Sequence, residues 1–386
     1  MLSNVNIDMV QAQHTPVQIV DNYMGNVNLT IEGENTLSSA GNHAALQKNG
    51  DATTGTLTIS GNGKLTAKAM DYEYGAYAYG GGIGGTTNQM GSNIVINGGE
   101  IYARGSRYGA GIGGGYNSIG QNITINGGTV NVSAGERGAG IGGGYYAKGT
   151  DITINGGNVY AQSSFGAGIG GGQNGDGRNI AIHGGTIEAY GSGYGAGIGG
   201  GYHASGSKIE IKNCQVKAVA KYSNAAGIGG GEKGHGVDIL IENAEVIAKG
   251  GTNAPGIGDG YSNGSWYNSP ADVEYGVNII QSTVTSYGGT SATGMGGGKD
   301  KTYSYSISIS ESSVKNVSKA DNSEIGSSIA NKLFLVMNQI GEGAVSVNCI
   351  CIPNNGGNSF SYRKTNEEEE YTEISLPARH DADSYY

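Results

Sequence analysis

The chain has 386 residues and a formal net charge of −10, and its lysine and arginine residues are scattered without forming a basic stripe. This distribution excludes nucleic acid as an expected partner, because phosphate backbones are bound by clustered positive charge. No stretch approaches the roughly 18 consecutive apolar residues of a membrane-spanning helix, so we expect no insertion into a membrane.

The first 46 residues are expected to form an imperfect leading coil. Residues 1–7 alternate like a strand and lack the pattern of a signal peptide, so we expect an exported protein whose leader is not part of this chain. Residues 27–31 alternate in the same way, and Leu37 occupies a further strand position. Leu46 aligns with the aliphatic residues that recur through the rest of the chain.

A repeat with a period of about 29 residues organises residues 47–332. Each copy holds one large aliphatic residue, which we call the anchor, within a short run of glycines that we call the glycine bed. Neighbouring anchors lie 28 to 30 residues apart, except for one interval of 38 residues. The anchors are Ile83, Ile112, Ile141, Ile169, Ile198, Ile228, Ile257, Met295 and Ile325.

The copy at 112–133 illustrates the local structure that each repeat predicts. Residues 123–125 alternate apolar and polar, which is typical of a half-buried strand. Residues 126–128 read Asn-Gly-Gly, a turn sequence, because both residue types accept a positive φ. Val130 and Val132 then begin a second inward-facing strand. We therefore expect about three short strands and no helix in each repeat.

Stacking each strand on its counterpart in the next repeat predicts an all-β fold, a parallel β-helix of about ten coils of about 29 residues. Each coil would advance by the strand spacing of about 4.8 Å. We expect a right-handed winding, because parallel crossovers strongly favour it. The glycine beds would let one wall of each coil lie flat against its neighbours.

Residues 333–386 are expected to close the end of the β-helix. The segments 333–337 and 345–352 have strand patterns, and a cap would protect the edge of the last coil. The acidic run at 367–370 is interpreted as a solvated tail segment.

Three cysteines do not make a disulfide framework. Cys214 takes the place of a turn glycine, while Cys349 and Cys351 lie two apart in one apparent strand. We expect buried thiols rather than metal or redox sites. The six histidines lack the spacing of metal ligands, so neither a metal nor a cofactor is expected.

Tyrosine is in excess, with 25 residues against three phenylalanines and one tryptophan. The position just after the glycine bed holds a tyrosine in four copies: Tyr116, Tyr145, Tyr202 and Tyr261. Such a row could stack on sugar rings, since a tyrosine combines an apolar face with a polar tip. Alternatively, the tyrosines stack on one another and cover the glycine wall. A sparser second row, Tyr102, Tyr160 and Tyr190, leaves the same two interpretations open.

The interval of 38 residues carries the clearest departure from the repeat. Asp259 replaces a glycine of the bed, and the enlarged loop after it contains Trp266, Tyr267, Asp272 and Glu274. Aromatic rings beside carboxylates suit sugar binding, and insertions in repeat proteins often form the binding face. Asp259 with Asp272 or Glu274 would also provide a pair of carboxylates for glycosidic cleavage. Decay of the repeat near its end explains the same residues without a site.

The sequence resembles known repeats at two places. The run from Gly109 to Tyr116, followed by Ile-Thr-Ile-Asn-Gly-Gly-Thr-Val at 123–130, resembles the glycine-rich repeats of large bacterial cell-surface proteins. Residues 29–37 resemble the opening of β-helical carbohydrate-binding domains in such proteins. The resemblance spans residues 27–316 and implies export, presentation on a cell surface and recognition of polysaccharide. It brings no catalytic motif.

Three functions remain open from the sequence. The first is an extracellular bacterial surface module that binds or adheres to a carbohydrate, either a polysaccharide or a host or surface glycan. The second is a polysaccharide-degrading β-helix enzyme, a lyase or a glycoside hydrolase. The third is a structural stalk or filament unit. Binding is favoured over catalysis, because the sequence contains no recognisable catalytic motif.

Overall fold

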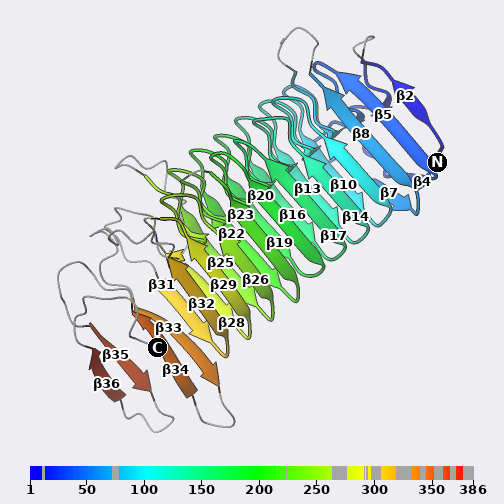
Figure 1. The fold of residues 1–386 in the computed structure, drawn as a ribbon. Helices are drawn as coiled ribbons and strands as arrows, with labels where there is room; N and C mark the ends of the chain where they lie inside the picture. Colours follow the sequence, from blue (N-terminus) through cyan, green and yellow to red (C-terminus); the bar gives the residue numbers. More distant parts are fainter. Residues whose placement is uncertain are drawn as a thin grey trace.

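The computed structural model describes residues 1–10, 14–71, 78–222, 224–262, 276–290, 292, 294–296, 306–318, 333–339, 345–351, 360–365 and 371–376. Every secondary-structure element within these residues is a β-strand, and the strands wind into a rod (Figure 1). Three parallel sheets, which we call A, B and C, run along the rod and receive one strand each from successive coils. The predicted parallel β-helix is confirmed. Among the described residues, no helix is long and apolar enough to cross a membrane.

Sheet A contains the Ile-x-Ile strands of the repeat. Its inward residues stack in register, so that Ile123 lies beside Ile94 on one side and Ile152 on the other. The described strands are β1 (Leu2–Ser3), β4 (Val27–Glu32), β7 (Leu57–Gly61), β10 (Gly91–Ile96), β13 (Gly120–Ile125), β16 (Gly149–Ile154), β19 (Gly177–Ile182), β22 (Gly206–Lys212), β25 (Gly236–Glu242), β28 (Gly276–Ile280) and β31 (Ser306–Ser310).

Sheet B follows the tight turn after each strand of sheet A. Val130 and Val132 of β14 point inward and are buried, as the alternation predicted. The described strands are β2 (Asn6–Asp8), β5 (Glu34–Ala40), β8 (Lys64–Met70), β11 (Glu100–Arg104), β14 (Thr129–Ser133), β17 (Asn158–Ser163), β20 (Thr186–Gly191), β23 (Gln215–Ala220), β26 (Glu245–Lys249), β29 (Thr283–Gly288) and β32 (Ser313–Ser318).

Sheet C contains the anchors, and most of its strands are two residues long. The described strands are β3 (Val17–Ile19), β6 (Leu46–Lys48), β9 (Ile83–Gly84), β12 (Ile112–Gly113), β15 (Ile141–Gly142), β18 (Ile169–Gly170), β21 (Ile198–Gly199), β24 (Ile228–Gly229), β27 (Ile257–Gly258) and β30 (Met295–Gly296). Leu46 pairs with Ile83, which confirms its alignment with the anchors. Ile325 lies outside the described residues.

The core is a set of aliphatic columns parallel to the rod axis. In one coil, Ile94, Ile96, Ile101 and Ile112 are all fully buried, and the same four positions repeat along the stack. Burying one such side chain contributes roughly 1.5–3 kcal/mol relative to leaving it exposed. A coil therefore gains its stability mainly from the coils above and below it.

The N-terminal segment contains two coils where the sequence predicted one. Strands β1, β2 and β3 stack on β4, β5 and β6 in the same order as in later coils. The strand pattern of residues 1–7 was predicted, but a separate first coil was not, because its strands span only two or three residues. It also carries neither a glycine bed nor an Ile-x-Ile pair. The leading segment is therefore part of the β-helix itself.

Two antiparallel hairpins follow the last described coil. The first joins β33 (Leu333–Gln339) to β34 (Val345–Cys351), as the strand patterns indicated. The second joins β35 (Phe360–Thr365) to β36 (Tyr371–Leu376) and was not predicted. Strand β33 lies next to β32 at the end of the rod (Figure 1). Its role as a cap stays a prediction, and the acidic run at 367–370 lies outside the described residues.

The glycine beds allow the coils to approach each other closely, and Gly113 shows why. Its φ is +131°, a conformation that other residues rarely adopt. A Cβ atom at this position would lie 2.1 Å from the carbonyl oxygen of Gly142 in the next coil. Because the same geometry recurs after most anchors, the sequence of sheet C is restricted along nearly the whole rod.

Cys214 marks a change in the turn between sheets A and B. In the copy around Gly128, that glycine takes the positive φ of 90°. In the Cys214 copy the preceding Asn213 takes it instead, with φ 52°, and the Cys214 side chain is buried in the core. Burial raises the pKa of the Cys214 thiol to about 11. The predicted buried thiol is confirmed at this position.

We expect Gly113→Ala to lower the free energy of unfolding by roughly 1–3 kcal/mol or more, since the new Cβ needs both a strained φ and a shift of the neighbouring coil. Gly127→Ala in the same repeat is the matched control. Its Cβ would lie 3.3 Å from the nearest atom and no positive φ is required, so the change should stay within about 1 kcal/mol. Chemical denaturation followed by circular dichroism measures both, and equal losses would contradict the close-approach argument.

Candidate functional site

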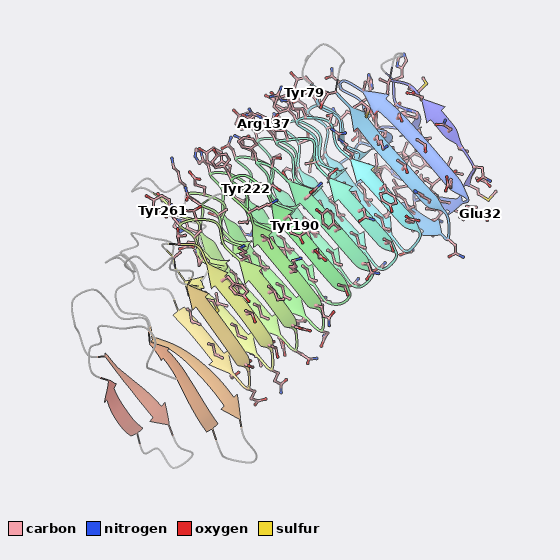
Figure 2. The ribbon with its side chains drawn as sticks, in the orientation of Figure 1. Glu32, Tyr79, Arg137, Tyr190, Tyr222 and Tyr261 are labelled. Atoms are coloured by element: carbon pink, nitrogen blue, oxygen red, sulfur yellow. The ribbon has the colours of Figure 1, made fainter. Side chains whose placement is uncertain are left out.

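The tyrosines after the glycine bed form the first candidate surface. The backbone N–H of each tyrosine donates a hydrogen bond to a backbone carbonyl in the previous coil. The acceptor is the residue just before the glycine bed of that coil. Tyr116 bonds in this way to the Tyr79 carbonyl at 2.8 Å, and Tyr145 bonds to that of Tyr108 at 2.9 Å. Two columns of side chains therefore stand next to each other along one edge of the rod (Figure 2).

The side chains of these two columns contact one another, and we call the set the tyrosine ladder. Tyr79 and Tyr108 stack at 5.3 Å between ring centroids, and Tyr108 and Tyr145 do the same. The Arg137 guanidinium bridges the next step, 5.2 Å from the Tyr145 ring and 5.4 Å from that of Phe165. The members are Tyr79, Tyr108, Tyr116, Arg137, Tyr145, Tyr146, Phe165, Tyr194 and Tyr202.

The ladder supports the second interpretation of the tyrosine row, in which the rings stack on one another and cover the glycine wall. Tyr116, Tyr145 and Tyr202 are each only partly exposed. Tyr261 lies beyond the ladder and donates its N–H to the Asn224 carbonyl at 2.6 Å. Sugar binding by these four tyrosines stays a prediction.

Tyr145 is a tyrosine of the ladder with a raised pKa. Burial and a hydrogen bond with Tyr146 raise the pKa of Tyr145 to about 12, although the neighbouring Arg137 acts in the opposite direction. Arg137 Nη1 donates to the Tyr145 hydroxyl at 3.4 Å. The structure therefore holds this phenol neutral at pH values where a solvated tyrosine ionises.

This shift predicts a loss of stability in alkali. The unfolded chain ionises Tyr145 near pH 10, whereas the folded chain resists ionisation up to about pH 12. The folded state therefore loses stability relative to the unfolded state as the pH rises from 10 to 12. The variant Tyr145→Phe should show a smaller loss across this range than the unsubstituted chain. Unfolding midpoints measured at several pH values test this, and identical slopes would argue against the shift.

Asp259 is buried inside the β-helix and forms a hydrogen bond with the backbone. The residue is fully buried, with 0% of its surface exposed, and it occupies the second position after the anchor Ile257. Its Oδ1 accepts a hydrogen bond from the Gly236 N–H at 2.5 Å and lies 3.9 Å from His235 Nδ1. The described contacts therefore place the Asp259 carboxylate inside the coil rather than on a surface that a sugar reaches.

The acceptor role of Asp259 explains why an aspartate replaces a glycine there. Glycines equivalent to Gly236 in earlier coils donate to a backbone carbonyl one coil further on; Gly206, for example, donates to the His235 carbonyl at 2.8 Å. The equivalent acceptor for Gly236 falls within residues 263–275, which lie outside the described residues. A carboxylate oxygen from Asp259 accepts this hydrogen bond at the point where the repeat is interrupted.

The remaining residues of the predicted loop site lie outside the described residues. They are Trp266, Tyr267, Asp272 and Glu274. The sugar site in this loop, and the carboxylate pair that an enzyme would need, therefore stay predictions.

We expect Asp259→Ala to destabilise the chain by roughly 1–3 kcal/mol, because it leaves a buried N–H without this acceptor. Asp259→Asn keeps an oxygen at the same place and should cost less. Thermal unfolding of the two variants measures the difference. If Asp259→Ala unfolds at the temperature of the unsubstituted chain, the carboxylate has no structural role.

The second tyrosine row lies on the outer face of sheet B. Tyr102, Asn131 and Tyr160 occupy one column on consecutive coils. Tyr190 does not continue this column: it pairs with Gln162, while Glu188 pairs with Tyr160. Because Tyr190 lies two positions further along its strand, it faces the same side, and its ring contacts that of Tyr160 at 5.3 Å. Figure 2 shows Tyr190 on this broad face.

A hollow of about 390 Å³ opens on this face around Asn131, and we call it the first hollow. It forms because the short Asn131 and Ser133 lie between longer side chains on the coils before and after them. Its polar and aromatic lining comprises Lys68, Tyr102, Arg104, Asn131, Ser133, Tyr160 and Gln162.

Hydrogen bonds hold the two tyrosines that flank the first hollow. The Tyr102 hydroxyl donates to Glu100 at 2.5 Å, and this bond raises the pKa of Tyr102. The Tyr160 hydroxyl donates to Gln162 at 3.0 Å. Both rings are thus oriented by hydrogen bonds, an arrangement that would lower the entropic cost of binding a ligand on this face.

A second hollow of about 200 Å³ lies further along the same face, over β20, β23 and β26. Lys217 Nζ lies 3.2 Å from Glu188, and the Tyr190 hydroxyl also donates to Glu188. The hydrogen bond from Tyr190 and the contact with Lys217 lower the pKa of Glu188. Ile247 is 42% exposed and supplies an apolar side to this second hollow.

Comparisons with known proteins agree with the architecture. The model of the beta helix repeat family matches residues 94–116, 123–145, 152–173, 180–202 and 239–261. Each match begins in a strand of sheet A and ends just after a glycine bed. The five matched segments are similar to β-helix repeats, which agrees with the parallel β-helix of the structure. No curated protein and no solved structure matched the chain.

Sequence reasoning found part of this surface. It named Tyr102 and Tyr160, but it missed the other polar residues that line the first hollow: Lys68, Arg104, Asn131, Ser133 and Gln162. The strand alternation already placed all of these side chains on the outer face of sheet B. Within the described residues, no cluster of histidine, cysteine, aspartate and glutamate side chains is suited to hold a metal ion.

Proposed function

We propose that this chain is an extracellular surface module that binds a polysaccharide along the outer face of sheet B. The observation that carries the proposal is the first hollow, where Tyr102 and Tyr160 flank the polar Asn131. Aromatic faces suit the apolar sides of sugar rings, and amide groups suit their hydroxyls. The bacterial cell-surface setting rests on the resemblance of the repeats.

A long ligand fits this surface better than a compact one. Both hollows are shallow, open regions of one continuous sheet, and the contact between Tyr160 and Tyr190 lies between them. Tyr102 and Tyr160 stand two coils apart, about 9.6 Å at the usual strand spacing of about 4.8 Å. A polymer of repeating sugar units can match a surface whose positions also repeat.

Binding is favoured over catalysis by the environment of Asp259. The carboxylate is buried and accepts a hydrogen bond from Gly236, so it already has a structural role. On the described residues, no observation favours an acid–base pair for cleavage. The enzymatic alternative, Asp259 with Asp272 or Glu274, therefore depends on Asp272 and Glu274, which lie outside the described residues.

An array of immobilised polysaccharides, followed by affinity measurements on variants, tests the proposal. Tyr102→Ala and Tyr160→Ala should each weaken binding roughly tenfold or more, since a loss of about 1.4 kcal/mol corresponds to a factor of ten. Tyr194→Ala is the matched control, because Tyr194 belongs to the tyrosine ladder and is 39% exposed.

Four other outcomes would contradict the proposal. Loss of binding in Tyr194→Ala alone would move the site to the tyrosine ladder. Loss in Trp266→Ala alone would move it to the enlarged loop. Turnover of a bound polysaccharide would indicate an enzyme, and the absence of binding to any polysaccharide would favour a structural stalk.

A further inference from the structure

Cationic side chains line and flank the first hollow. Arg104 of β11 pairs in register with Lys68 of β8, so both exposed side chains stand in one outward column about 4.8 Å apart along the rod. Lys64 Nζ lies 4.9 Å from the Tyr102 ring on the same side. Three cations therefore gather at one end of the face, in a chain whose net charge is −10.

These cations are available to a ligand. Neither Lys68 nor Arg104 forms an ion pair with a described residue, whereas Lys217 in the second hollow is already paired with Glu188. Glu100 and Glu34 pair in register with Lys64, and Glu100 accepts the hydrogen bond of Tyr102. The column of Lys68 and Arg104 continues through Ser38 to Asp8, which lies two coils before Lys68. Within the part of the chain that the structure describes, Lys68 and Arg104 of the first hollow thus have no ion-pair partner, while the second hollow offers a mixture of both signs.

The two hollows also differ in what they offer a sugar. The first combines two oriented tyrosines with Lys68 and Arg104. The second combines Lys217 with the carboxylates of Glu188 and Glu245, which accept hydrogen bonds from hydroxyl groups. From β8 to β26 the face covers six steps between coils, about 29 Å at about 4.8 Å each. This length accommodates several sugar units.

Resting on the carbohydrate binding proposed above, we infer that the ligand is an acidic polysaccharide that lies parallel to the rod axis. A carboxylate or sulfate group of one sugar is held by Lys68 and Arg104 in the first hollow. The chain then passes the contact between Tyr160 and Tyr190, and hydroxyl groups of a later sugar meet Glu188 and Glu245.

The test uses the full chain and three oligosaccharide sets of matched length: carboxylated, sulfated and neutral. The double variant Lys68→Gln with Arg104→Gln should weaken binding of acidic oligosaccharides at least tenfold at low salt. It should leave binding of any neutral oligosaccharide unchanged and reduce the dependence of affinity on salt, because exposed charges are screened. Lys148→Gln is the control, since Lys148 lies outside sheet B and pairs with Asp176.

A preference for the carboxylated or the sulfated set would support the inference and identify the group that is recognised. Equal affinity for neutral and acidic oligosaccharides, with no effect of the double variant, would overturn it while leaving polysaccharide binding intact. Absence of binding to all three sets would overturn both proposals.

Chain length provides a second measurement. Tyr190→Ala should weaken binding only of acidic oligosaccharides that are long enough to reach both hollows. An equal effect of Tyr190→Ala on disaccharides would contradict the extended orientation of the ligand.

Discussion

The close approach of successive glycine beds is the constraint on which the rest of the rod depends. A Cβ at Gly113 would collide with the Gly142 carbonyl, and the same contact recurs along sheet C. This contact fixes the spacing and register of each coil relative to the next. The aliphatic columns then pack in line, and the outward side chains of sheet B stand in rows. The repeated glycine beds of sheet C thus hold the coils in a regular stack. The outward side chains of sheet B can then differ from coil to coil while keeping regular positions.

Glycines from Gly85 to Gly230 form a column at the second position after the anchor, and a buried charged residue flanks this run on each side. Asp259 occupies this position in the coil of Ile257, and Lys48 occupies the equivalent position in the coil of Leu46. The Lys48 ammonium donates to the Thr54 hydroxyl at 2.9 Å, and burial lowers the pKa of Lys48. Both residues belong to coils that are longer than the repeat. We interpret both residues as donors or acceptors of side-chain hydrogen bonds that join an irregular coil to a regular one.

Periodicity predicted the stacking, the anchors and the inward residues, because equal coil lengths leave few other ways to bury Ile123 and its equivalents. It did not predict the first coil or the hairpin of β35 and β36, whose strands lie outside the repeat. Sequence alone could not predict that Asp259 accepts a hydrogen bond from Gly236, because the donor is a backbone N–H and every residue except proline carries one. The first hollow depends on a short Asn131 between two tyrosines, and this becomes visible only when coils are aligned in register.

We therefore assign structure and function to different faces: the glycine wall and the tyrosine ladder hold the rod together, and the outer face of sheet B is the proposed binding surface. A crystal structure of the chain with a bound acidic oligosaccharide tests this division most directly. Our account predicts sugar density over Tyr102, Asn131 and Tyr160, parallel to the rod axis and with an acidic group at Lys68 and Arg104. Density over the tyrosine ladder or against residues 263–275, with an empty sheet B face, would contradict it.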